Sequence, residues 1–218
     1  FELSTDMFGR ENEKQRLEAA LAELSQQKQV KMLLITGDSG SGKSHLLQQT
    51  IKKYKCQELA KGFTCILQGG KYEAQVEPFP YQALSLSMQH WLRQILLAEP
   101  ELVEKWKQRF QKTFQTPPVT LLTLAPQLNM FFEIADHANA SPLETSLETP
   151  QARKAHMKLT VIKFFQLLIK HQGPLLIAVD DLHWADTASL EWLSWLLKEH
   201  SLKEILILAT ARSEANPK

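Results

Sequence analysis

Residues 37–44 read Gly37-Asp38-Ser39-Gly40-Ser41-Gly42-Lys43-Ser44. An apolar run over 30–36 precedes them, typical of a buried strand, and Leu47, Ile51 and Tyr54 follow at helical spacing. Glycines let successive backbone amides point inward, and the following helix presents its positive N-terminal end. The spacing G-x-x-x-x-G-K-S arises by chance in a chain of this length about once in a hundred. The stretch therefore predicts a phosphate-binding loop.

Two side chains of this loop are candidates for nucleotide contacts. Lys43 is expected to reach the β- and γ-phosphates as a compact charge, and the Ser44 hydroxyl to ligate Mg²⁺. The sequence lacks the Asn-Lys-x-Asp string with which guanine-specific GTPases read the base, so we predict ATP and ADP, with Mg²⁺, as cofactors. The predicted cofactor-binding segment comprises Gly37, Asp38, Ser39, Gly40, Ser41, Gly42, Lys43, Ser44 and His45.

A second candidate element, a pair of acids, follows the apolar run over 174–179. Asp180 and Asp181 end this predicted strand. An acid at a strand end is often only a turn residue, but beside a phosphate-binding loop it can hold the metal through water. We assign Asp180 to the metal and Asp181 to polarising the attacking water. Many P-loop ATPases have Glu at the position of Asp181. Asp is one methylene shorter, so slow hydrolysis is expected.

A third candidate lies after the predicted strand over 205–210. Arg212 follows this strand, and the tip of the strand lies at the ligand edge of a parallel sheet. Arg212 is therefore a candidate catalytic contact to the γ-phosphate, and Thr210 a candidate to hold water. The structural alternative is a surface arginine in a turn.

Strands alternate with helices along the chain. Strands are predicted at 30–36, 63–67, 174–180 and 205–210, the second ending at Gly69-Gly70, and helices at 80–96 and 156–170. We predict an α/β P-loop NTPase fold, a doubly wound, mainly parallel sheet flanked by helices. It forms one ATPase core over 1–218, with a largely helical insert over 71–173 between the second and third strands.

The composition limits the partners and the compartment. Lys and Arg number 25 against 24 Asp and Glu, for a net charge of +1, so no global field favours nucleic acid or an anionic membrane. Two cysteines without metal-ligand spacing suit a reducing compartment. No apolar run approaches the roughly 20 residues of a membrane span, and residues 1–6 do not form a signal peptide. We predict a cytoplasmic protein and expect the chain to be part of a longer one.

Two further stretches resemble a known family. Met7-Phe8-Gly9-Arg10-Glu11-Asn12-Glu13 resembles the opening of the STAND and AAA+ related ATPases. Residues 180–190, from Asp180-Asp181 through His183-Trp184 to Leu190, are similar to a box of their predicted-ATPase branch, found in bacterial sensor kinases, Ser/Thr kinases, transcription regulators and nucleotide cyclases.

The resemblance implies more than the spacing does. Phe8, Gly9 and Arg10 would lie near adenine, and Arg212 would match the arginine that closes the family's sensor strand. A fifth core strand and a helical lid are expected beyond the C-terminus. The family acts as a nucleotide-controlled switch, closed with ADP, opened by ATP and often self-associating, together with flanking regulatory and output domains.

The predicted function is therefore a Mg-ATP-binding regulatory ATPase module of a larger intracellular protein. Two alternatives stay open. One is a nucleic-acid-directed AAA+ ATPase of the origin-recognition or helicase-loading type. An adjoining winged-helix domain or a basic stripe would support this alternative. The other is a pseudo-enzyme that binds ATP only as a scaffold.

Overall fold

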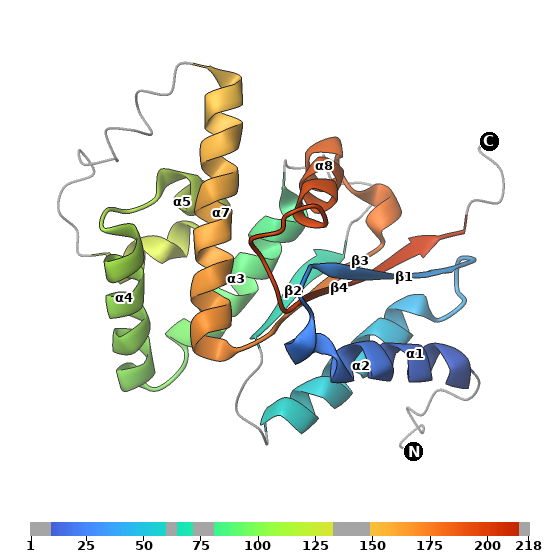
Figure 1. The fold of residues 1–218 in the computed structure, drawn as a ribbon. Coiled ribbons are helices and arrows are strands. Elements are labelled where there is room, and N and C mark those ends of the chain that lie inside the picture. Colours follow the sequence, from blue (N-terminus) through green and yellow to red (C-terminus); the bar gives the residue numbers. More distant parts are fainter. Residues whose placement is uncertain (1–9, 60–64, 72–80, 133–148, 214–218) are drawn as a thin grey trace.

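A parallel sheet of four strands forms the centre of the structure (Figure 1). The computed structural model describes residues 10–59, 65–71, 81–132 and 149–213. The strands lie in the order β1-β4-β3-β2, and every neighbouring pair is parallel. Their carboxyl ends therefore meet at one edge of the sheet. The bounds are β1 (Lys31–Gly37), β2 (Cys65–Lys71), β3 (Leu175–Asp180) and β4 (Ile205–Arg212).

Helices cover both faces of this sheet, because successive side chains of β3 and β4 point to opposite sides. Leu176 and Leu206 pack with α1 and α2 on one face, whereas Leu175 and Ile205 pack with the remaining helices on the other. Figure 1 shows the two groups on opposite sides of the strands. The helices are α1 (Glu11–Ala22), α2 (Lys43–Leu59), α3 (Gln82–Leu96), α4 (Pro100–Phe114), α5 (Val119–Leu124), α7 (Pro150–Gln172) and α8 (Thr187–Leu196). Short 3₁₀ turns span Leu24–Gln26 (η1), Pro126–Phe131 (η2) and Leu182–Trp184 (η3).

The structure confirms the predicted α/β class and the helical insert between β2 and β3, with two differences at element ends. Helix α7 begins earlier than residue 156, because the Thr149 hydroxyl accepts the Ala152 amide at 3.2 Å and Pro150 suits a first helical turn. Strand β2 continues through Gly69 and Gly70 to Lys71. Its register with β3 shifts between Gln68 and Lys71, an irregularity that glycines accommodate.

An aromatic cluster joins the helical insert to the sheet. Trp106 and Phe110 of α4 are fully buried and both contact Trp91 of α3, and Phe110 also contacts Phe164 of α7. The Trp91 and Trp106 rings meet edge to face, with centroids 5.1 Å apart. Because α7 leads directly into β3, this packing ties the insert to the strand that carries Asp180.

The Trp106 side chain provides a test of this core. Its indole Nε1 is buried without a hydrogen-bond partner among the described residues. Trp106→Phe removes that unpaired group, worth about 1–3 kcal/mol, which offsets the lost contacts. We expect Trp106→Phe to change the free energy of unfolding by less than about 1.5 kcal/mol, whereas Trp106→Ala costs about 3–5 kcal/mol. Urea denaturation of both variants measures the difference, and equal losses would contradict this account.

Candidate active site

The sheet brings together three segments that lie far apart in the sequence. Strand β4 pairs with β1 on one side, where Gly37 lies opposite Arg212, and with β3 on the other, where Val179 lies opposite Ala209. The ends of β1, β3 and β4 therefore carry the phosphate-binding loop, the acid pair and Arg212 to one edge. This is the edge at which open parallel sheets bind ligands.

The Asp180 carboxylate is the centre of a hydrogen-bonded group. Its Oδ1 atom accepts from the Ser44 hydroxyl at 2.9 Å and from the Thr210 hydroxyl at 2.5 Å. The Asp181 amide in turn donates to the Thr210 oxygen at 2.8 Å. Thr210 is fully buried and Asp180 nearly so, which holds the carboxylate in one orientation beside the Ser44 hydroxyl. A carboxylate and a hydroxyl in this arrangement are ligands that suit Mg²⁺.

Lys43 lies inside the loop with its charge held by carbonyl dipoles. Its side chain is buried, and Nζ donates to the carbonyl oxygens of Gly37 and Asp38 at 2.9 and 2.7 Å. No carboxylate forms an ion pair with this ammonium within the described residues. Gly40 and Gly42 have positive φ angles of 76° and 81°, which side chains with a Cβ rarely adopt. The loop thus presents a positive charge and a permissive backbone, as phosphate binding requires.

The other residues that we predict to contact the nucleotide have different surroundings. Arg10, itself in a left-handed conformation, donates from Nη2 to the Ser41 carbonyl oxygen at 2.6 Å and so braces the loop. Phe8 and Gly9 lie outside the described residues. The remaining members, exposed at the surface of the loop or on the first turn of α2, are Asp38, Ser39, Gly40 and His45.

Asp181 stands directly after β3 in a left-handed conformation, with φ of 55°. Its side chain is 17% exposed, and its Oδ1 lies 3.9 Å from Nδ1 of His183. The pKa of His183 is lowered, mainly by burial; Arg212 and Lys43 lower it further, while Asp181 opposes them. His183 is therefore neutral at neutral pH, so it does not neutralise Asp181. The Asp181 carboxylate remains the candidate acceptor for a proton from water.

Arg212 lies at the tip of β4, with its guanidinium 5.7 Å from the centre of the Trp184 ring. Trp184 is 42% exposed, so this cation–π contact lies at the surface of the site. Arg212 was recognisable from the sequence, but its contact with Trp184 was not, although Trp184 follows the acid pair closely. Nor was Ser213, whose hydroxyl donates to Asp38 Oδ1 at 2.9 Å and whose amide donates to the Gly37 carbonyl at 3.2 Å. No local signal in the sequence pairs Ser213 with a loop so distant along the chain.

Comparison with protein families agrees with this geometry. The family described as "AAA ATPase domain" matches residues 6–208, which include β1, β2, β3 and the first half of β4 but not Thr210 or Arg212. The chain belongs to this family. No curated protein sequence matches it. The P-loop ATPase fold predicted from residues 37–44 is thereby confirmed at the level of the AAA ATPase domain, whereas membership of the STAND branch stays a prediction.

Two solved structures are similar in fold to this AAA ATPase domain. The ORC2 protein of Aeropyrum pernix, whose structure is described as ADPNP–ADP complexes, aligns with 95% of this chain at a TM-score of 0.50 and 14% identity. PCH-2 of C. elegans aligns with 96% at a TM-score of 0.41 and 13% identity. The chain spans 42% and 40% of those two proteins, respectively. At 14% identity the likeness to the ORC2 protein shows the fold alone. In the described part of the chain, no helix is long and apolar enough to cross a membrane.

Proposed function

We propose that this AAA ATPase domain binds Mg-ATP and Mg-ADP and acts as a nucleotide-dependent switch within a larger signalling or regulatory protein. The observation that carries the proposal is the meeting of the Ser44 hydroxyl and the Asp180 carboxylate, 2.9 Å apart, beside a buried Lys43. A loop amide cradle, a lysine, a hydroxyl and a strand-end acid together make up the parts of a P-loop NTPase site.

The site residues suit Mg²⁺ bound to nucleotide better than a metal bound by protein alone. The described residues contain no group of three His, Cys, Asp or Glu side chains that could hold a metal. Mg²⁺ needs fewer protein ligands, because it retains waters and shares phosphate oxygens. Ser44 and Asp180 would hold it, where its charge would offset that of the phosphates. Lys43 binds and orients the β- and γ-phosphates, and Asp181 accepts the proton of the attacking water.

Arg212 supports the switch part of the proposal. Its contact with Trp184 is exposed and therefore weak, about 0.5–1 kcal/mol, so a γ-phosphate can compete for the guanidinium. ADP lacks that phosphate and leaves Arg212 on Trp184. Two nucleotides then favour two arrangements of the same side chain, which is the differential contact that a population shift requires.

The exposed edge of strand β1 supports the expectation of a fifth strand. Among the described strands β1 pairs only with β4, and Leu34 on β1 is 49% exposed. Side chains of a further strand beside β1 that point to the same face of the sheet would pack against Leu34. A fifth strand and a lid, flanking output domains, self-association and a cytoplasmic location remain parts of the proposal.

We expect Arg212→Ala to weaken ATP binding about tenfold, the value of one charge-assisted hydrogen bond less the Trp184 contact, and to leave ADP binding unchanged. Trp184→Ala should act in the opposite direction and strengthen ATP binding a few-fold, because it frees Arg212. Calorimetric titration of both nucleotides into the parent and each variant measures this, with phosphate release recorded in parallel.

Arg153→Ala, which removes an exposed arginine of α7 outside the site, is the matched control. Equal losses for ATP and ADP in Arg212→Ala would refute the switch role of Arg212. ATP binding without any phosphate release by the parent protein would instead favour the scaffold alternative.

A further inference from the structure

A groove between α4 and α7, on the helical insert, collects positive charge. It encloses about 580 Å³, within the range of small-molecule sites. The Lys, Arg and His side chains that line it are Lys105, Arg109, Lys112, Lys163, Lys170 and His171. The other described residues that line it are neutral, so none of its described lining residues is a carboxylate.

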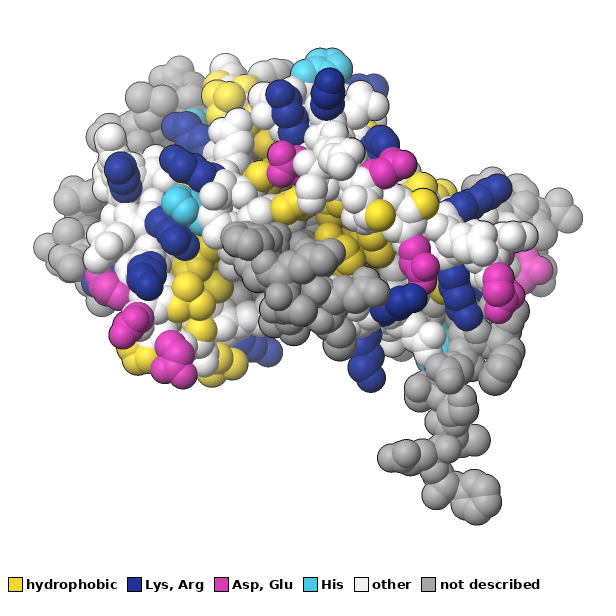
Figure 2. All heavy atoms as spheres, turned by 60° about the horizontal axis from the view of Figure 1, so that its bottom comes forward, with side chains coloured by type: hydrophobic (Ala, Val, Ile, Leu, Met, Phe, Trp, Pro, Cys, Tyr) yellow, Lys and Arg dark blue, Asp and Glu magenta, His cyan; other side chains and the backbone are white. Residues whose placement is uncertain are grey.

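The described residues provide no ion-pair partner for the Lys and Arg side chains of the groove. Figure 2 shows Lys and Arg side chains gathered at the left, on the side of α4 and α7, with the acidic side chains there at the lower margin. Like charges this close repel one another, which costs stability unless an anion is bound.

Helix dipoles explain only part of this arrangement. Lys112 lies in the last turn of α4, and Lys170 and His171 in the last turn of α7, where cations are favourable. Lys105 and Lys163 lie away from either C-terminal turn, so this effect does not explain them. Arg109 gains from its position 4.8 Å from the Trp106 ring centre, but that contact needs no further cations around it.

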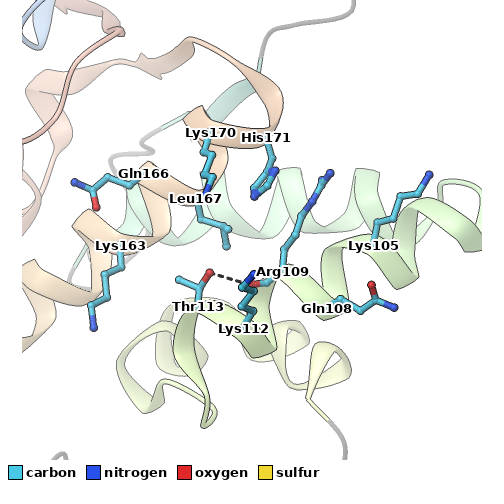
Figure 3. Close-up of a pocket in the computed structure, with 10 residues that line it drawn as sticks. All are labelled: Lys105, Gln108, Arg109, Lys112, Thr113, Lys163, Gln166, Leu167, Lys170 and His171. Atoms are coloured by element: carbon cyan, nitrogen blue, oxygen red, sulfur yellow. Dashed lines mark hydrogen bonds between the residues drawn. The ribbon is translucent and has the colours of Figure 1, made fainter.

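The cations converge from two helices. Figure 3 shows Arg109 of α4 and Lys170 and His171 of α7 directed into the space between the helices, whereas Lys105 and Lys163 extend outward at its margins. On each helix the charged stretch covers two turns, about 10 Å. Flexible lysines at the margins can rotate inward, so several donors can contact one anion of that length.

We propose that the groove between α4 and α7 is a second anion-binding site, separate from the phosphate-binding loop, for a small polyphosphate such as the phosphate chain of a nucleotide. Guanidinium and ammonium donors suit phosphate oxygens. The short charged stretch matches two or three linked phosphates better than a long polymer. Among the described lining residues there is no exposed aromatic ring to stack bases, as sites for single-stranded nucleic acid commonly have.

His171 provides a local signal for this site. Burial and the positive charges of Arg109 and Lys170 lower its pKa. Its ring meets the buried Trp106 ring edge to face, with centroids 6.1 Å apart. A bound polyphosphate stabilises the imidazolium and offsets both cations, so it should raise the pKa of His171. Occupancy of the phosphate-binding loop does not produce this change, because the loop lies at the far edge of the sheet.

The experiment titrates inorganic tripolyphosphate into the protein with saturating Mg-ADP present. Proton NMR follows the His171 ring signal, assigned with His171→Gln, across a pH series with and without tripolyphosphate. We expect the pKa of His171 to rise and calorimetry to show binding. Lys112→Gln/Lys170→Gln should weaken that binding about 30–100-fold, near tenfold per charge-assisted hydrogen bond. Both lysines are exposed, so the substitutions leave the core intact.

The matched control is Lys28→Gln/Lys198→Gln, which removes the same charge from exposed positions outside the groove. It should bind tripolyphosphate like the parent. A nucleoside triphosphate tested in a Lys43→Met background shows whether a base adds affinity. An unmoved His171 signal, or equal loss in both double variants, would overturn the proposal. So would a single-stranded oligonucleotide that binds more tightly than tripolyphosphate with affinity rising with length, which would indicate a nucleic-acid surface instead.

Discussion

Lys43→Met should weaken the binding of both Mg-ATP and Mg-ADP by roughly 10–150-fold, because a charge-assisted hydrogen bond contributes about 1.5–3 kcal/mol. Lys43 is buried, and among the described residues its ammonium donates to carbonyl oxygens and, at 3.5 Å, to the Ser41 hydroxyl. Its charge is thus free to act on phosphate. Met retains the length of the side chain and removes the charge, so packing in the loop changes little. Isothermal titration calorimetry with each nucleotide measures the effect.

Lys52→Met is the matched control, since Lys52 is exposed on the same helix, α2. Its nucleotide affinities should equal those of the parent. Removing the Lys43 ammonium also leaves the Gly37 and Asp38 carbonyls without their donor, so the melting temperature of each variant has to be recorded. Unchanged affinity in a folded Lys43→Met protein would show that nucleotide does not bind at residues 37–44.

The second large effect concerns the acid pair, Asp180 and Asp181. Substitution of each acid should have a different effect on binding and turnover. Asp180→Asn should weaken nucleotide binding only when Mg²⁺ is present, because the carboxylate beside Ser44 loses its charge. Asn retains a carbonyl oxygen that can accept from the Ser44 and Thr210 hydroxyls, so the local structure should survive. Asp181→Asn should bind Mg-ATP normally and lower turnover by about 10²–10⁴-fold, as expected for loss of a general base.

Each variant serves as the control for the other. Binding is titrated with Mg²⁺ and with EDTA, and phosphate release is measured under single-turnover conditions. Hydrolysis by Asp181→Asn at the parent rate would contradict the assignment of the base. A loss of affinity in Asp180→Asn that is the same in EDTA would show that the carboxylate acts on the loop and not on a metal.

Several parts of the fold were predictable because their signals are local. The run 30–36 before the glycines, the run before Asp180 and the run 205–210 are short apolar stretches, and each forms a strand near the predicted position. The ends of elements were less predictable. A cap at Thr149 extends α7, and a register shift lets β2 continue past Gly69-Gly70, and both depend on contacts that apolar periodicity does not report.

The candidate site divides in the same way. The P-loop motif at residues 37–44 was recognisable from its spacing alone, and the acid pair was recognisable once that loop was known. By contrast, the sequence indicated Thr210 only as a candidate to hold water, and it did not indicate that the Thr210 hydroxyl donates to the Asp180 carboxylate and accepts a hydrogen bond from the Asp181 amide. That contact exists because β3 and β4 are neighbours in parallel register. Strand neighbours are set by packing across the whole sheet, which no short sequence window contains.

The sequence by itself determined that residues 37–44 carry a P-loop motif, since that motif depends only on glycines, a lysine and a serine at fixed spacing within one short segment. Only the tertiary structure decided which distant groups act together. In the tertiary structure Arg212 contacts the Trp184 ring, and the Ser213 hydroxyl donates to Asp38 of the loop. The cations of α4 and those of α7 line the same groove. The physical reason is that charge–charge and hydrogen-bond energies depend on distance in space, and folding brings close residues that lie far apart along the chain.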